Sequence, residues 1–314
     1  MGSTFLGRGL WLAHGPLVNP LEATGMPFDL LLEAIIGGVL LGCFYAAVSM
    51  GLSVAFGLLD VPHIAHPAFV IVGAYGTYLL TQYGLDPLVA GTLLTPVFFA
   101  GGLAVYRFYH AAFERRGTDA GLRGLVFFFG VAFILEVALI LLFGVDQRMV
   151  EASYIGRSLV LGEVRIPMRM LVAVGVALLL TVALATYLSQ TFMGRAIKAV
   201  AQDEGALALM GADPVRVKQW AFGIATATCA LAGALMIIVG PVEPGLGRLY
   251  IGRAFCVTVL AGLGSMTGTL AAGVILGVAE SVVLTSFGSS WAPAVAFGIL
   301  LVVLAVRPAG LFGR

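Results

Sequence analysis

Long uninterrupted apolar runs recur along almost the whole chain, and residues 125–143 and 171–188 are typical examples. A helix needs about 20 consecutive apolar residues to cross the hydrocarbon core of a bilayer. A membrane-spanning β-barrel would instead show roughly ten-residue stretches of alternating polarity. Only 11% of the residues are charged, against roughly 25% in soluble domains. The sequence therefore predicts an all-α, polytopic membrane protein with about eight transmembrane helices, at least one of them broken.

We expect residues 1–27 to form a lead-in and residues 28–314 to form one transmembrane domain. The apolar runs predict helices at 28–49, 64–82, 88–109, 122–143, 168–188, 219–240, 252–286 and 291–306. Pro62 predicts a break before the second helix, because proline lacks an N–H donor and restricts the preceding residue. The run 252–286 is too long for one simple span, and its glycines predict a break near 264–268. That run is therefore either one broken helix or two half-helices.

Three polar segments separate the apolar runs, at residues 107–123, 146–169 and 190–218. The first and third are rich in arginine and lysine, so the positive-inside rule places both in the cytoplasm. The middle segment then faces outside. Arg307 and Arg314 suggest a cytoplasmic C-terminus, whereas a count of single spans after the third segment places it outside. A break at Gly264 would decide between these two alternatives.

The third polar segment, 190–218, predicts a short helix over residues 195–210. Gly211 supplies a C-terminal stop, and Asp213 followed by Pro214 can start the next helix. A short amphipathic helix in a loop can dock in a groove on a partner protein. The alternative is a plain connector that lies on the surface.

A few polar side chains lie within or beside the apolar runs, namely Glu33, Asp60, His63, His66, Glu136 and Glu280. A charge at the bilayer centre costs at least about 2.5 kcal/mol, so such residues usually face a cavity or a partner. Glu136 lies in the middle of its run and is the best candidate for a solute pathway. The alternative is a structural hydrogen bond between helices, or backbone capping by the two histidines.

The sequence lacks the residues that several classes of function require. The formal net charge of +1 gives no basic field for nucleic acid. The sequence contains no Gly-x-x-x-x-Gly-Lys-Ser/Thr loop, so we expect no ATP binding through a P-loop. His63 and His66 are three residues apart without a third convincing ligand, so we predict neither a metal site nor a cofactor. Cys43, Cys229 and Cys256 lie in apolar stretches, where a thiol behaves as a small hydrophobe.

The loop 190–218 resembles the coupling loop of permease subunits of ABC importers, most of all the branched-chain amino acid family. That family's loop reads Gly-Arg-Ala, then Ala-x-Ala-x-Asp, then Ala and Leu-Gly. The residues at those positions are Gly194, Arg195, Ala196, Ala199, Ala201, Asp203, Ala206, Met210 and Gly211. Other importers carry a Glu-Ala-Ala-x-x-x-Gly loop, which Glu204, Ala206 and Gly211 approximate with one residue of extra spacing.

Two further segments resemble the same family. The family's Gly-x-Gly-Ser-x-x-Gly motif is matched by Gly262, Gly264, Ser265 and Gly268. Residues 307–314 look like its Pro-x-Gly-x-x-Gly-Arg ending. The family's Asn-Phe-Ala-His-Gly-Glu stretch is altered here, because His63, Pro67 and Ala68 replace the Asn, the Gly and the acid. The family's Arg-Pro-Leu-Arg stretch after the third helix is also missing around residues 114–123.

The resemblance implies a permease subunit, in the cell inner membrane, that forms the translocation path for a branched-chain amino acid or a similar small polar solute. It implies a second permease, two cytoplasmic ATPases and an extracytoplasmic solute-binding protein as partners, with 190–218 as the cytoplasmic coupling loop. The path candidates are His63, His66, Glu136, Gly262, Gly264, Ser265, Gly268 and Glu280. The alternative is an ion-coupled secondary transporter with Glu136 or Glu280 as its proton site.

Overall fold

The computed structural model describes residues 28–59, 61, 63–114, 120–161 and 164–313. The predicted lead-in 1–27 lies outside the described residues. The regular structure of the described residues is helical apart from one short hairpin. The helices are α1 (Phe28–Leu59), α2 (His66–Thr81), α3 (Pro87–Ala112), α4 (Ala120–Phe143), α5 (Met168–Gln190), α6 (Phe192–Val200), α7 (Glu204–Leu209), α8 (Pro214–Val239), α9 (Gly247–Ala261), α10 (Met266–Phe287) and α11 (Ala292–Val306). Two short 3-10 turns, η2 (Pro244–Leu246) and η3 (Ser289–Trp291), precede α9 and α11.

Six of the described helices are long and apolar enough to cross a membrane, namely α1, α3, α4, α5, α8 and α10. The helices α2, α9 and α11 are shorter, with 16, 15 and 15 residues. The polytopic helical class predicted from the apolar runs is therefore confirmed. The short helices explain why counting apolar runs gives about eight spans.

The first helix is longer than predicted, because α1 continues to Leu59 instead of ending at 49. Residues 50–59 contain no proline, so nothing in them removes a backbone donor or forces a break. The break predicted near Pro62 does occur, between Leu59 and the start of α2 at His66. Asp60 and Pro62 themselves lie outside the described residues.

The last long apolar run divides into two helices, as the glycines predict. The helix α9 ends at Ala261 and α10 begins at Met266, with Gly262 and Gly264 in the left-handed region at φ of 82° and 80°. Glycine adopts such angles without steric cost, so the chain can turn from α9 into α10 within the four residues 262–265. The structure therefore has two helices here, and α9 starts at 247, earlier than the predicted 252.

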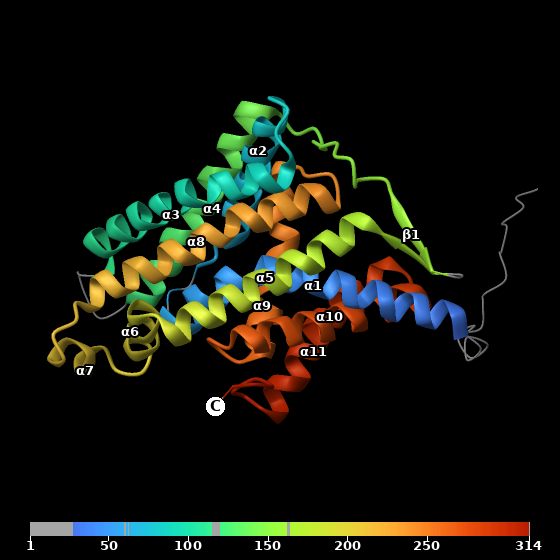
Figure 1. Ribbon diagram of the computed structural model, residues 1–314. Coiled ribbons are helices and arrows are strands. Elements are labelled where there is room, and N and C mark those ends of the chain that lie inside the picture. Colours follow the sequence, from blue (N-terminus) through green and yellow to red (C-terminus); the bar gives the residue numbers. More distant parts are fainter. Residues whose placement is uncertain (1–27, 60, 62, 115–119, 162–163, 314) are drawn as a thin grey trace, which may run out of the picture.

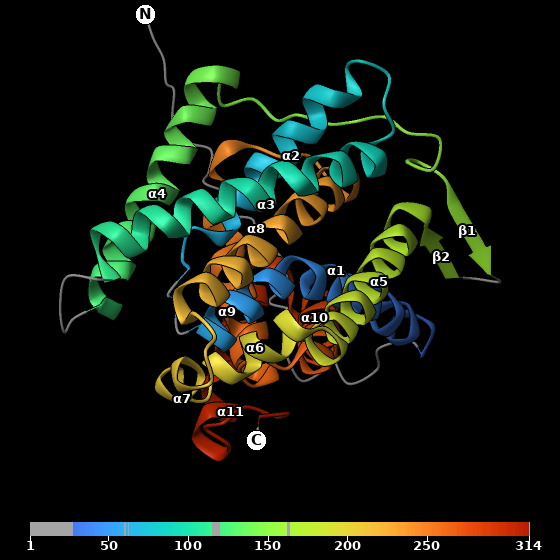
Figure 2. The ribbon, with the colours of Figure 1, turned by 60° about the vertical axis from the view of Figure 1, so that its left-hand side comes forward.

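The bundle has two distinct ends (Figure 1). At the loop end lie α6 and α7, and at the hairpin end lies an antiparallel pair of strands, β1 (Ser158–Leu161) and β2 (Val164–Pro167), which the sequence did not predict. Figure 2 shows α4 and α5 on opposite sides of the bundle, with α1 and α8 between them. Close packing of small residues holds the centre: a Cβ on Gly42 of α1 would lie 2.5 Å from the carbonyl oxygen of Gly273 in α10.

The polar segments follow the predicted alternation between the two ends. Lys218, at the start of α8, lies 3.2 Å from Glu114, just after α3, so the first and third segments meet at the loop end. The middle segment is at the hairpin end, where Tyr154 donates to Asp86 at 3.2 Å. The C-terminal segment is at the loop end, since Leu311 N–H donates to the carbonyl of Leu260 at 2.9 Å. The break between α9 and α10 thus brings the C-terminus back to the loop segment 190–218.

Candidate functional site

The junction between α5 and α6 folds tightly around Gly194. Thr191 ends α5 and caps α6, and its Oγ1 accepts from Gly194 N–H at 2.9 Å. A Cβ on Gly194 would lie 2.6 Å from the Cα of Leu188, so any other residue would separate the two helices. This close approach gives a physical reason for the glycine in the Gly194-Arg195-Ala196 sequence.

The predicted single helix over 195–210 is wrong, because two helices occupy this segment. The helix α6 ends at Val200, and Asp203 then caps a second helix, α7, by accepting from Ala206 N–H at 2.9 Å through Oδ1. Aspartate favours such a cap over a helix interior, because its carboxylate satisfies a backbone donor that a helix start leaves unpaired. Gly211 follows α7 with φ of 84°, which confirms the predicted C-terminal stop.

The end of the second loop helix, α7, presents large apolar side chains away from the bundle. Ala196 and Ile197 of α6 are buried against the bundle, whereas Arg195 is exposed. Leu209 and Met210, at the end of α7, are 91% and 84% exposed. These large apolar groups lie on a loop outside the spans, where water would surround them. Such a surface is typical of a contact with another protein.

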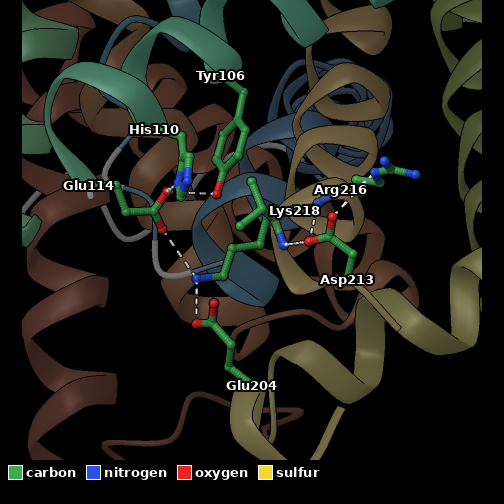
Figure 3. Close-up of polar contacts among 8 residues, drawn as sticks. Tyr106, His110, Glu114, Glu204, Asp213, Arg216 and Lys218 are labelled. Carbon is green, nitrogen blue, oxygen red and sulfur yellow. Dashed lines mark hydrogen bonds and ion pairs between the residues drawn. The ribbon is translucent and has the colours of Figure 1, made fainter. Parts of the chain in front are cut away.

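A charged network joins α7 to the ends of α3 and α8. Figure 3 shows Lys218 between Glu114 and Glu204, which it contacts at 3.2 and 2.6 Å. Tyr106 donates to Glu114 at 2.9 Å, and His110 Nδ1 lies 2.8 Å from the same carboxylate. Burial by itself would raise the pKa of Glu114, but these hydrogen bonds and the Lys218 charge outweigh it and lower the pKa. We define Tyr106, His110, Glu114, Glu204 and Lys218 as the Lys218 network.

The glycine motif and the C-terminal segment contact each other at the loop end. A Cβ on Gly262 would lie 2.6 Å from the Cα of Gly313, and one on Gly57 would lie 2.9 Å from the Cα of Gly264. Ser265 caps α10 and accepts from Gly268 N–H at 3.1 Å. A cavity of about 620 Å³ separates this turn from α6. Gly262, Gly264, Ser265 and Gly268 therefore shape the loop end of the bundle.

His63 and His66 are both fully enclosed, at 1% and 0% exposed. His66 Nε2 donates to the carbonyl of Val48 at 2.8 Å, which leaves Nδ1 to accept from the Cys229 thiol at 3.3 Å. His63 lies among the rings of Phe69, Phe128 and Phe222, and neither of its nitrogens has a hydrogen-bond partner among the described residues. His66 therefore ties α2 to α1, while His63 retains unused hydrogen-bonding capacity.

Both carboxylates predicted for the pathway are paired with arginines of α9. Glu280 in α10 is 3.0 Å from Arg253 and accepts from the Tyr45 hydroxyl at 2.7 Å. Glu136 in α4 forms an ion pair with Arg248. Glu33 lies exposed in α1. Sequence reasoning missed both arginines: Arg248 lies before the predicted helix start at 252, and Arg253, although inside that predicted helix, was not paired with an acid. Two arginines near the beginning of an apolar run, with two lone acids elsewhere, were the available signal.

Two adjacent cavities open beside α4 and α9. The first has a volume of about 320 Å³, and Pro67, Ala68, Glu136, Gly247 and Arg248 are among its lining residues. The second has a volume of about 410 Å³ and is lined partly by His63. Ile64 and Ile251 line both cavities. Of the predicted path residues, His63 and Glu136 therefore lie on neighbouring cavities, whereas His66 and Glu280 line neither.

No group of three or more His, Cys, Asp or Glu side chains able to hold a metal ion occurs among the described residues. Six described helices that are long and apolar enough to span a membrane, with cavities within the bundle, are the general architecture expected of a membrane transport protein. Residues 34–304 match the family described as branched-chain amino acid transport system / permease component. The chain belongs to this family, and it is a multi-pass protein of the inner membrane and not an enzyme.

Individual relatives agree with this assignment. The chain is 30% identical over 298 residues to the high-affinity branched-chain amino acid transport system permease protein BraD of Pseudomonas aeruginosa, covering 90% of this chain and 96% of BraD. It is 27% identical over 301 residues to LivH of Escherichia coli K12, a permease protein of the same description, covering 91% of this chain and 97% of LivH. The solved PsaBC structure from Streptococcus pneumoniae aligns over 92% of this chain and 96% of that chain, with a TM-score of 0.45 and 13% identity.

Proposed function

We propose that this chain is the permease subunit of an ABC importer for a branched-chain amino acid or a similar small polar solute. In this proposal it pairs with a second permease, and two ATPases bind at its loop end in the cytoplasm. A solute-binding protein delivers the solute at the hairpin end. The observation that carries the proposal is the exposed pair of loop helices, α6 and α7, in a chain that belongs to a transport permease family.

The exposed apolar tip of α7 supports ATPase docking. Leu209 and Met210 are almost fully exposed, and the sequence contains no P-loop of its own. Burying two large apolar side chains on a partner contributes about 1.5–3 kcal/mol for each fully buried one. The Lys218 network connects α7 to two spanning helices, so a partner that moves α7 would act on the spans directly.

The second candidate, an ion-coupled secondary transporter, needs an intramembrane carboxylate that releases and rebinds protons. Glu136 and Glu280 are each ion-paired with an arginine, so neither is the lone intramembrane carboxylate that such a mechanism uses. A secondary transporter also has no use for a loop that docks on an ATPase. These two features favour the importer over the secondary transporter.

Site-specific cross-linking tests the docking surface. All three native cysteines, Cys43, Cys229 and Cys256, are buried, so one introduced thiol can be labelled selectively. In the complex purified with its ATP-hydrolysing subunits, Leu209→Cys should cross-link to the ATPase. The matched control is Tyr83→Cys, where Tyr83 is 84% exposed in the loop that follows α2. Cross-linking from position 83, or none from position 209, would contradict the proposed docking.

A further inference from the structure

The cavity that holds Glu136 and Arg248 lies where two helix starts meet. A Cβ on Gly247, at the start of α9, would lie 3.5 Å from the carbonyl carbon of Pro67 and 3.6 Å from Ala68 N, at the start of α2. Neither helix start carries a capping side chain among the described residues. Helix N-termini carry a partial positive charge, and here the preceding turns already supply partners for His66 N–H and Leu246 N–H, which donate to the carbonyls of His63 and Glu243. Both starts therefore add to the positive charge of Arg248 on this side of the cavity.

The ion pair lies within the apolar part of the bundle. Glu136 is seven residues before the end of α4 at Phe143, which places it about 10 Å from the hairpin end of that helix. Its side chain is 14% exposed, whereas that of Arg248 is 75% exposed. A guanidinium in contact with lipid is costly at this depth. The exposed arginine therefore faces a space that contains water, solute or a partner subunit.

The rest of the cavity wall is apolar. Its apolar lining includes Ile64, Phe129, Phe133 and Ile251. Ligand sites for small molecules have volumes of about 300–1,000 Å³ and combine apolar walls with a few charged groups. The volume of about 320 Å³ and the pair of opposite charges match a small zwitterion with an apolar side chain.

A second ion pair on α9 provides a contrast within the same chain. Arg253 and Glu280 are also an arginine of α9 and a glutamate of a neighbouring helix. There, however, the glutamate is only 3% exposed, and the rings of Tyr45 and Tyr250 lie 5.7 and 5.8 Å from the guanidinium carbon. That pair is covered by aromatic side chains, so we assign it a structural role.

Resting on the proposed import function, we propose that Glu136 and Arg248 form a transit site for the solute. Glu136 accepts the α-ammonium group of an apolar amino acid, and Arg248, with the starts of α2 and α9, binds its α-carboxylate. The two protein charges pair with each other when the site is empty. The solute then moves into the adjacent cavity lined by His63, in the direction of the loop end.

The test is uptake of radiolabelled L-leucine by the complete transporter in proteoliposomes, with the ATPases and binding protein unchanged. Glu136→Gln and Arg248→Gln should each lower uptake at subsaturating leucine by about tenfold or more, as expected for the loss of a charged hydrogen bond. Gly245→Leu should lower it as well, because a Cβ there would lie 3.7 Å from both charged groups. The matched control, Glu280→Gln, should lower thermal stability while uptake per assembled complex stays normal.

A charge exchange separates solute binding from a structural role. The double variant Glu136→Arg with Arg248→Glu restores an ion pair, so a purely structural pair predicts normal uptake. Our inference predicts an assembled complex without uptake, because a solute bound in the reversed orientation would place its ammonium group beside the partial positive charge of the two helix starts. Normal uptake by the double variant, or by both glutamine variants, would overturn the inference while the import function stands. No ATP-driven leucine uptake by the wild-type complex would overturn the assignment of leucine as a solute and this inference together.

Discussion

Replacing Lys218 by methionine tests whether the Lys218 network stabilises the loop end. Methionine retains much of the aliphatic stem and removes the charge that contacts Glu114 at 3.2 Å and Glu204 at 2.6 Å. The Lys218 and Glu114 side chains are only 13% and 19% exposed, so water would compensate the remaining carboxylate poorly. We therefore expect Lys218→Met to lower the free energy of unfolding.

The magnitude follows from the geometry. Two unit charges 3.2 Å apart attract by about 5 kcal/mol at an effective dielectric constant near 20. Desolvation offsets much of this, and hydrogen bonds to charged groups contribute about 1.5–3 kcal/mol net. The half-exposed Glu204 adds about 0.5 kcal/mol. The total of about 2–3.5 kcal/mol corresponds to a fall in Tm of roughly 3–5 °C for a chain of this size.

The assay is thermal unfolding of the purified protein in detergent, with Arg216→Met as the matched control. Arg216 forms an ion pair with Asp213 at the same distance of 3.2 Å, but these side chains are 81% and 51% exposed. An exposed pair contributes little, so the control should change Tm by about 1 °C or less. Equal falls in Tm for the two variants, or no fall for Lys218→Met, would refute the reasoning that burial sets the strength of this network.

Three further predictions concern the loop end. Gly211→Val should abolish ATP-driven uptake while the complex still assembles, because φ of 84° costs a β-branched residue about 2 kcal/mol or more and displaces α7; normal uptake in proteoliposomes would contradict this. Gly194→Ala should lower the free energy of unfolding by about 1–3 kcal/mol, seen as a lower Tm, because the added Cβ would press on Leu188. The control Gly121→Ala has open space at its added Cβ and should leave the Tm unchanged. The pKa of Glu114 in the native protein lies below its ordinary value of 4.5. The stability that the charged Glu114 side chain contributes is therefore complete above pH 4.5 and is lost as the pH falls through the native pKa. The Tm difference between wild type and Glu114→Gln should be constant at neutral pH and disappear in acid.

Much of the fold follows from the apolar runs, since a bilayer permits few structures other than helices. Local signals also predicted the break between α9 and α10, the stop at Gly211 and the helix start at Asp213, because each depends on one residue's backbone chemistry. The division of the loop into α6 and α7 was missed. Asp203 caps α7 only because residues 201–203 leave the helix, and helix propensity over 195–210 gives no sign of that.

The candidate site was less predictable than the fold. Glu136 was predicted as a path residue from its isolation among apolar neighbours, and that role stays a prediction. Its partner, Arg248, lies 112 residues further along the chain. Pairing at such a separation depends on how the turn η2, directly before α9, packs against α4, which no local pattern encodes. The same holds for Lys218 and Glu114, whose contact depends on the packing of α3 against α8.

ATP dependence of solute flux tests the central claim most directly. The purified chain is reconstituted in proteoliposomes, alone and with its second permease, ATPases and binding protein, and uptake of radiolabelled L-leucine is measured with ATP or with an imposed proton gradient. The importer predicts uptake only from the complete complex and only with ATP. Robust flux through the single chain, driven by a proton gradient, would contradict the account.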